Sequence, residues 1–216
     1  NNIFFKIILI LYRHITYNYF MKSRLNKITT KTGDQGFTSV SDGNKTSKND
    51  PVIHVLGELD ELNCSIGLLK AKLNEFDHSK KKYLRFVDIL VDIQHDLFNI
   101  GGEISAPNIN LFDANRINLI TEFSKNLNEE LEPLKEFILP GNSFASSLAH
   151  STRAICRRAE RNFINMIEKN QIMKNKHLKT GVPYLNRLSD LFFIISRHLD
   201  EMEDEKNEFW EKPKKK

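Results

Sequence analysis

The chain has 216 residues, of which 40% are hydrophobic, so it is long enough for one domain with a single sizeable core. Its 32 basic and 28 acidic residues nearly balance, and the formal net charge of +4 excludes the strong positive field of a general nucleic-acid binder. Any anion-binding site must therefore be local. The only two cysteines, Cys64 and Cys156, exclude a disulfide framework and are expected to be small buried side chains in a reducing compartment.

Residues 1–27 form an N-terminal extension with a composition of its own. Its segment 3–20 is apolar and aromatic, but Lys6 and Arg13 interrupt it, so it is too broken for a membrane span. The extension carries basic but no acidic side chains, which is the balance expected of a mitochondrial targeting segment. The alternative is that Met21 is the true start of a cytoplasmic protein and that the upstream residues are a non-native flank.

From residue 50 onward the apolar residues recur at helical spacing, which predicts an all-α fold of five helices. Asp50 and Pro51 open the first, as a polar cap followed by a proline in the first turn. The second is expected over 80–100, with a stop at the glycine pair Gly101–Gly102. The remaining three are expected over about 114–129, from Ser143 onward and from Val182 onward.

The short connections between these helices predict a bundle of ferritin-like, up-down topology over residues 28–206. Stretches rich in lysine and asparagine at 42–49 and 169–180 are expected to be loops. Residues 207–216 form a Lys-rich tail, which is expected to be solvated and disordered from Trp210 onward.

The first candidate site is the segment 29–39, which precedes the first helix. It concentrates hydroxyl groups, two glycines and a lysine, and such a loop can turn backbone amides toward a phosphate. It lacks the Gly-Lys-Ser/Thr ending of a Walker A loop. By composition alone, an ordinary glycine turn is the commoner explanation.

The second candidate is a row of charged side chains on the fourth helix. Arg153, Arg157, Glu160 and Arg161 fall within an arc of about 100° that points away from the apolar face. Like charges four residues apart cost about 0.2–0.5 kcal/mol each in an isolated helix, and only Glu160 offsets them locally. A solvated charged face is the commoner explanation. A polyphosphate would explain the repulsion, because arginine forks fit phosphate oxygens.

The third candidate lies on the fifth helix, where Asn186, Asp190 and Arg197 share a face opposite the apolar stripe. An amide and a carboxylate one turn apart can orient a ribose hydroxyl or hold a metal through water, although an exposed polar face is an equally good explanation. The sequence has no motif for other kinds of site: it lacks zinc-ligand spacing, the nucleophile elbow of serine hydrolases and a base-stacking surface for nucleic acid.

These three constellations, in this order, resemble the family of trimeric, helical-bundle ATP:cob(I)alamin adenosyltransferases. The motifs that carry the resemblance are TKTGDQG at 30–36 followed by TS at 38–39, LGELDELN at 56–63, FILPG at 137–141, RAICRRAER at 153–161 and YLNRLSD at 184–190.

The resemblance implies transfer of the 5′-deoxyadenosyl group of ATP to cob(I)alamin, in a homotrimer with its active sites between subunits. It implies ATP-binding roles for Thr30, Lys31, Thr32, Gly33, Thr38, Ser39, Lys48, Arg157, Arg158, Ala159, Glu160, Arg161 and Asn186. The catalytic residues that it implies are Arg157, Arg161, Asp190 and Phe137.

The same resemblance implies a cobalamin site with Phe137, Asp60 and Arg153. Asp60 and Arg153 would form an ion pair between subunits, and Phe137 would displace the lower axial ligand of the corrin. Mg²⁺ would accompany the triphosphate without direct protein ligands. A corrinoid reductase and an adenosylcobalamin-dependent mutase are the expected protein partners, with neither nucleic acid nor a membrane involved.

Two alternatives stay open. A non-catalytic helical regulator that binds ATP or polyphosphate would keep the arginine row and the Thr-Gly loop but would need no corrin pocket. A scaffold that pairs its charged faces with acidic partners would show no ATP dependence of its thermal stability.

Overall fold

The computed structural model describes residues 29, 31–40, 43, 45–76, 83–169 and 179–213. The chain divides into two compact units, Asn1–Phe37 and Thr38–Lys216. The predicted extension 1–27 lies outside the described residues. The second unit contains five helices, which confirms the predicted all-α bundle: α2 (Pro51–Leu73), α3 (Leu84–Ser105), α4 (Asn115–Glu129), α5 (Phe144–Lys169) and α7 (Gly181–Met202).

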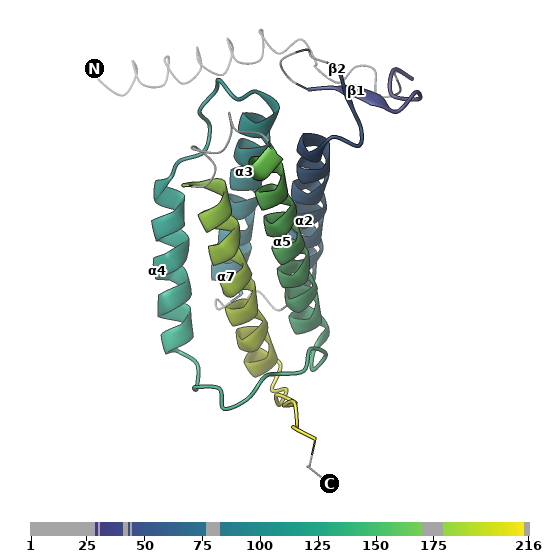
Figure 1. Ribbon diagram of the computed structural model, residues 1–216. Coiled ribbons are helices and arrows are strands. Elements are labelled where there is room, and N and C mark those ends of the chain that lie inside the picture. Colours follow the sequence, from purple (N-terminus) through teal and green to yellow (C-terminus); the bar gives the residue numbers. More distant parts are fainter. Residues whose placement is uncertain are drawn as a thin grey trace, which may run out of the picture. The chain divides into compact units, whose positions relative to one another are not determined.

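Consecutive helices of this unit run in opposite directions (Figure 1). α5 packs against both α2 and α7, while α3 packs on α2 and α4 packs on α7. Large side chains from four helices are completely buried between them, and full burial of each contributes about 1.5–3 kcal/mol. The bulkiest of these are Tyr184, Phe86, Phe163, Phe192, Leu62 and Ile66. Among the described residues, no helix combines the length and the apolarity needed to cross a bilayer.

The start of α2 follows the predicted capping pattern. The Asp50 side chain accepts a hydrogen bond of 2.8 Å from the Val52 amide, and Pro51 occupies the first turn. A cap of this kind stabilises a helix by about 1 kcal/mol. Because α2 carries Glu58, Asp60 and Glu61, this cap also sets where those carboxylates lie along the bundle.

The predicted end of α3 is wrong, because the helix runs through Gly101 and Gly102 to Ser105. Neither glycine has the positive φ that a terminating glycine uses. A Cβ added at Gly102 would lie 2.7 Å from Leu111 Cδ1, so the missing side chain makes room for the connection to α4. The buried Glu103 then accepts hydrogen bonds from two amides of that connection.

A short two-stranded sheet precedes the bundle. It is formed by β1 (Phe37–Ser39) and β2 (Lys45–Ser47), so the prediction of a loop over 42–49 is wrong for part of that stretch. Of the second predicted loop, 170–178 lies outside the described residues.

The C-terminal tail is also more ordered than its composition predicts. Ile138 and Phe209 form an antiparallel bridge, and the Trp210 amide donates a hydrogen bond of 2.8 Å to the Phe137 carbonyl. Lys212 forms an ion pair of 3.2 Å with Glu136. The expectation of disorder from Trp210 onward is therefore wrong for 210–212, whereas 214–216 lie outside the described residues.

The two cysteines differ from each other. Cys156 is buried, and burial raises the pKa of its thiol. Its Sγ donates to the Leu185 carbonyl at 3.2 Å, which joins α5 to α7. Cys64 is exposed on α2, so the expectation that both are buried is wrong for Cys64.

Candidate active site

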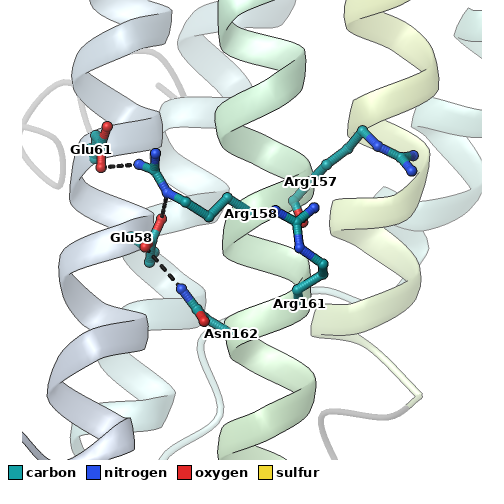
Figure 2. A network of polar contacts seen from close by, with 6 residues as sticks. All are labelled: Glu58, Glu61, Arg157, Arg158, Arg161 and Asn162. Carbon is teal, nitrogen blue, oxygen red and sulfur yellow. Dashed lines mark hydrogen bonds and ion pairs between the residues drawn. The ribbon is translucent and has the colours of Figure 1, made fainter.

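Arg158 on α5 points toward α2 and is held there by two glutamates (Figure 2). Its Nε donates to Glu58 Oε2 at 2.8 Å, and a terminal nitrogen forms an ion pair with Glu61. Asn162 donates to the other oxygen of Glu58 at 2.9 Å. These hydrogen bonds raise the pKa of Arg158. The guanidinium group of Arg158 is therefore engaged in joining two helices of its own chain.

Arg157 points to the opposite side of α5 from Arg158, as Figure 2 shows. Both Arg157 and Arg161 are exposed, and neither forms an ion pair within the described part of the chain. Arg161 Nη1 donates to the backbone carbonyl of Arg157, one helical turn earlier, at 3.0 Å, which folds the Arg161 side chain back along α5. Ala159, by contrast, is completely buried and faces the core. Arg157 and Arg161 therefore carry exposed positive charge that no ion pair offsets within the described part of the chain.

A line of polar contacts connects this face of α5 to α7. Glu160 Oε1 accepts a hydrogen bond of 3.1 Å from Asn186 Nδ2, so Asn186 engages the one carboxylate in the row. Arg187 donates to Asn186 Oδ1 at 2.7 Å and lies 3.8 Å from Asp190 Oδ2. The structure therefore places Asn186 and Asp190 beside the row. Sequence analysis missed Arg187, although its position between those two residues could have indicated it.

Arg153 and Asp60 both lack a partner among the described residues of their own chain. Arg153 is half-buried, and its Nε has no hydrogen-bond partner. Burial first, and the charge of Arg157 second, lower the pKa of Arg153. Asp60 is exposed on α2, where it lines a hollow of about 290 Å³ with Phe98 of α3. A carboxylate on α2 and a guanidinium group on α5 are thus left without an ion-pair partner in the described part of this chain.

Phe137 lies in the connection between α4 and α5, away from the arginine row along the chain, and its side chain is 76% exposed. Arg197 is turned toward the same connection: it is buried and donates to the Glu132 carbonyl. The expectation that Arg197 shares an exposed face with Asn186 and Asp190 is therefore wrong.

In the candidate segment 29–39, Thr30 alone lies outside the described residues. Lys31 has a φ of 59°, and a Gly36 amide to Gly33 carbonyl hydrogen bond of 3.2 Å closes a turn. Gly36 also has a positive φ, of 81°, so a left-handed residue lies at each end of this stretch. Thr32 is exposed in this turn, Thr38 and Ser39 belong to β1, and Lys48 is exposed just before α2.

Comparison with known proteins decides the family. The model of the family described as cobalamin adenosyltransferase matches residues 28–199. The chain belongs to the cobalamin adenosyltransferase family. A cobalamin adenosyltransferase of Cupriavidus metallidurans is 38% identical over 192 residues, covering 89% of this chain and 98% of the relative. The corrinoid adenosyltransferase MMAB of Bos taurus is 34% identical over 184 residues, covering 81% and 72% respectively.

Solved structures of this family have the same fold. A phenylalanine-to-alanine variant of the PduO-type ATP:corrinoid adenosyltransferase from Lactobacillus reuteri, complexed with cobalamin and ATP, matches with a TM-score of 0.74 and 28% identity, over 86% of this chain and all of that one. An arginine-to-lysine variant of that protein, complexed with ATP, has a TM-score of 0.71 at 28% identity, over 85% of this chain and 99% of that one.

Within one chain of this family member, the predicted site residues lie in separate places. The arginine row is joined by Asn186 and Asp190, whereas Asp60 lies on α2 and Phe137 lies in the α4–α5 connection. Over the described ranges, no three His, Cys, Asp or Glu side chains are grouped so that they could hold a metal ion.

Proposed function

We propose that this chain transfers the 5′-deoxyadenosyl group of ATP to cob(I)alamin, giving adenosylcobalamin and triphosphate. The observation that carries the proposal is the contrast between neighbouring arginines. Arg158 is paired with glutamates, while Arg157 and Arg161 stand exposed one turn apart without a carboxylate in the described part of the chain. A triphosphate supplies the negative charge that this row lacks, and guanidinium forks bind its oxygens bidentately.

The reaction needs positioning more than proton transfer. Cobalt(I) attacks C5′ of ATP with its own electron pair, so a Co–C bond forms as the C5′–O bond breaks and triphosphate leaves with that bond's electrons. No proton is removed from the reacting carbon, so no acid–base pair is required. Arg157 and Arg161 stabilise the charge that grows on the leaving triphosphate, and holding both substrates in line lowers the barrier further.

Phe137 is the proposed contact on the corrin side. The Phe137 ring is 76% exposed on a backbone that is hydrogen-bonded to the C-terminal residues, so it is accessible to an apolar ligand. The substituted phenylalanine and arginine of the L. reuteri relative lie 20 positions apart, as Phe137 and Arg157 do here. This spacing supports the assignment of those two residues, and Asp190 is proposed to support the arginine row from α7.

A homotrimer with active sites between subunits would complete the partial sites of one chain. Arg153 leaves a buried Nε without a partner and Asp60 leaves an exposed carboxylate unpaired, so an ion pair with Asp60 of the partner subunit would satisfy both. The proposed phosphate contacts from the N-terminal segment are Lys31, Thr32, Gly33, Thr38, Ser39 and Lys48. Mg²⁺ would be held by the phosphate oxygens, and the basic extension 1–27 is proposed to direct the chain to mitochondria.

Absorbance spectroscopy with chemically reduced cobalamin tests the proposed reaction. The adenosylcobalamin spectrum should grow when ATP is added and should not grow without it. A non-catalytic ATP-binding regulator predicts binding of ATP without this spectral change. With cob(II)alamin and a reductant such as reduced flavin, the variant Phe137→Ala separates the two sites, because its ATP binding should survive while transfer to cobalt falls sharply.

A further inference from the structure

The backbone around Phe137 is held by the C-terminal end of the chain. The Leu139 amide donates to the Glu208 carbonyl at 2.8 Å, and the Trp210 amide donates to the Phe137 carbonyl at 2.8 Å. We call residues 208–210 the C-terminal strap. The chain leaves α7 at the end of the bundle where the α4–α5 connection passes, which allows this pairing (Figure 1).

A buried carboxylate anchors the other side of the same segment. Asp200 is 1% exposed, and its Oδ2 accepts hydrogen bonds from Asn142 Nδ2 at 3.3 Å and from Ser146 Oγ at 2.9 Å. Asn142 Oδ1 in turn accepts from the Glu208 amide at 3.4 Å. Asn142 therefore connects the strap, the Phe137 segment and α7.

These contacts do not bury the Phe137 ring, which stays 76% exposed. They fix only the backbone that carries it. The pairing also keeps the neighbouring Ile138 side chain buried, at 9% exposed, whereas the Phe137 ring itself adds no core contact. A fixed backbone under Phe137 favours ligand binding, because a preorganised ring loses less conformational freedom when the ligand binds.

We propose that the C-terminal strap, with Asn142 and Asp200, positions Phe137 to remove the lower axial ligand of a bound Co(II) corrinoid. The inference rests on the proposed function and adds positioning residues that act through Phe137. The nitrogen of the lower ligand leaves cobalt with its electron pair, and a one-electron donor such as reduced flavin then converts Co(II) to Co(I). Loss of an axial donor makes this reduction easier, since axial ligation tunes the potential of a metal centre.

The strap should therefore matter only for corrinoids that carry a lower ligand and must still be reduced. Cob(II)alamin carries a nitrogen base in this position, whereas cob(II)inamide lacks the lower base and carries only a weakly bound water that leaves easily. Cob(I)alamin that has been reduced chemically beforehand needs no further electron. The three substrates separate positioning of Phe137 from any general damage to the site.

The matched variants are Trp210→Pro and Trp210→Ala. Both remove the indole, but only proline removes the amide that donates to the Phe137 carbonyl. With cob(II)alamin, ATP and reduced flavin, we expect Trp210→Pro to form adenosylcobalamin about tenfold more slowly than Trp210→Ala. This factor corresponds to the loss of the Trp210–Phe137 backbone hydrogen bond and the weakening of the adjacent Leu139–Glu208 bond. With cob(II)inamide or prereduced cob(I)alamin, the two variants should agree within about twofold.

Asn142→Ala provides a second route to the same answer, since it removes the side chain that joins the strap to Asp200. It should also slow adenosylation of cob(II)alamin more than that of cob(II)inamide. The strap proposal is overturned if the ratio of the rates with cob(II)alamin and cob(II)inamide is the same in Trp210→Pro as in Trp210→Ala, and the same in Asn142→Ala as in the unsubstituted protein. If the unsubstituted protein forms no product from any of the three corrinoids, the proposed function itself fails.

Discussion

Replacing Arg157 or Arg158 by alanine should separate ligand binding from stability, although the two residues are adjacent. Arg158→Ala removes a hydrogen bond of 2.8 Å to Glu58 and an ion pair to Glu61. Because Arg158 is 42% exposed, solvent screens these pairs, and together they contribute about 1–2 kcal/mol. For a chain of this size, that loss lowers Tm by about 2–8 °C.

Arg157→Ala should leave the stability of the free protein unchanged or slightly higher. The side chain is exposed, and it repels Arg153 and Arg161 at four-residue spacing, each at a cost of about 0.2–0.5 kcal/mol. Its loss should appear only with ATP. A charge-assisted hydrogen bond to phosphate contributes about 1.5–3 kcal/mol, so the affinity for ATP should fall roughly 10- to 150-fold.

Thermal unfolding with and without ATP and Mg²⁺ measures both effects. At a hundred times its Kd, ATP stabilises the unsubstituted protein by about 2.7 kcal/mol. At the same ATP concentration, Arg157→Ala should retain only about 0.3–1.4 kcal/mol of this stabilisation. Arg158→Ala should melt lower but keep most of the ATP-induced shift. Equal ATP-induced shifts in Arg157→Ala and the unsubstituted protein would refute the assignment of the arginine row to the triphosphate.

Three further changes test other parts of the structure. Burial, followed by the charge of Arg153, lowers the pKa of His150 below its ordinary value of 6.5, so the unfolded state binds more protons at mildly acidic pH. The free energy of unfolding in urea should therefore decrease as pH falls from about 7 to 5, and His150→Leu should make that decrease shallower; an unchanged slope would contradict this. Asp60→Arg should dissociate the proposed trimer in sedimentation velocity, and adding Arg153→Asp to the same chain should restore it, whereas a trimer unaffected by Asp60→Arg would exclude this ion pair. Phe192→Ala empties a completely buried position and should cost about 3–5 kcal/mol in chemical denaturation, so a loss below about 1 kcal/mol would argue against the packing described.

The features that were predicted correctly from the sequence depend on neighbours along the chain. The Asp50–Pro51 cap places the start of α2, and helical spacing places Arg157 and Arg161 on the exposed face of α5. Both follow from backbone geometry and from periodicity within one helix. Local patterns were therefore sufficient for the bundle and for the exposed part of the arginine row.

The features that were missed depend on contacts between distant segments. Gly102 in α3 closely approaches Leu111, and only the backbone conformation shows that neither Gly101 nor Gly102 has the positive φ of a terminating glycine. The pairing of Arg158 with Glu58 joins residues 100 positions apart. Composition also gives no sign that Trp210 pairs with the Phe137 segment, because its hydrogen bond uses the backbone.

Attack of cobalt at C5′ can be tested most directly by ³¹P NMR of a completed reaction between cob(I)alamin and ATP. Inorganic triphosphate should appear in an amount equal to the adenosylcobalamin formed, because only the C5′–O bond breaks. Release of ADP with phosphate, or of AMP with pyrophosphate, in place of triphosphate would contradict the proposed transfer.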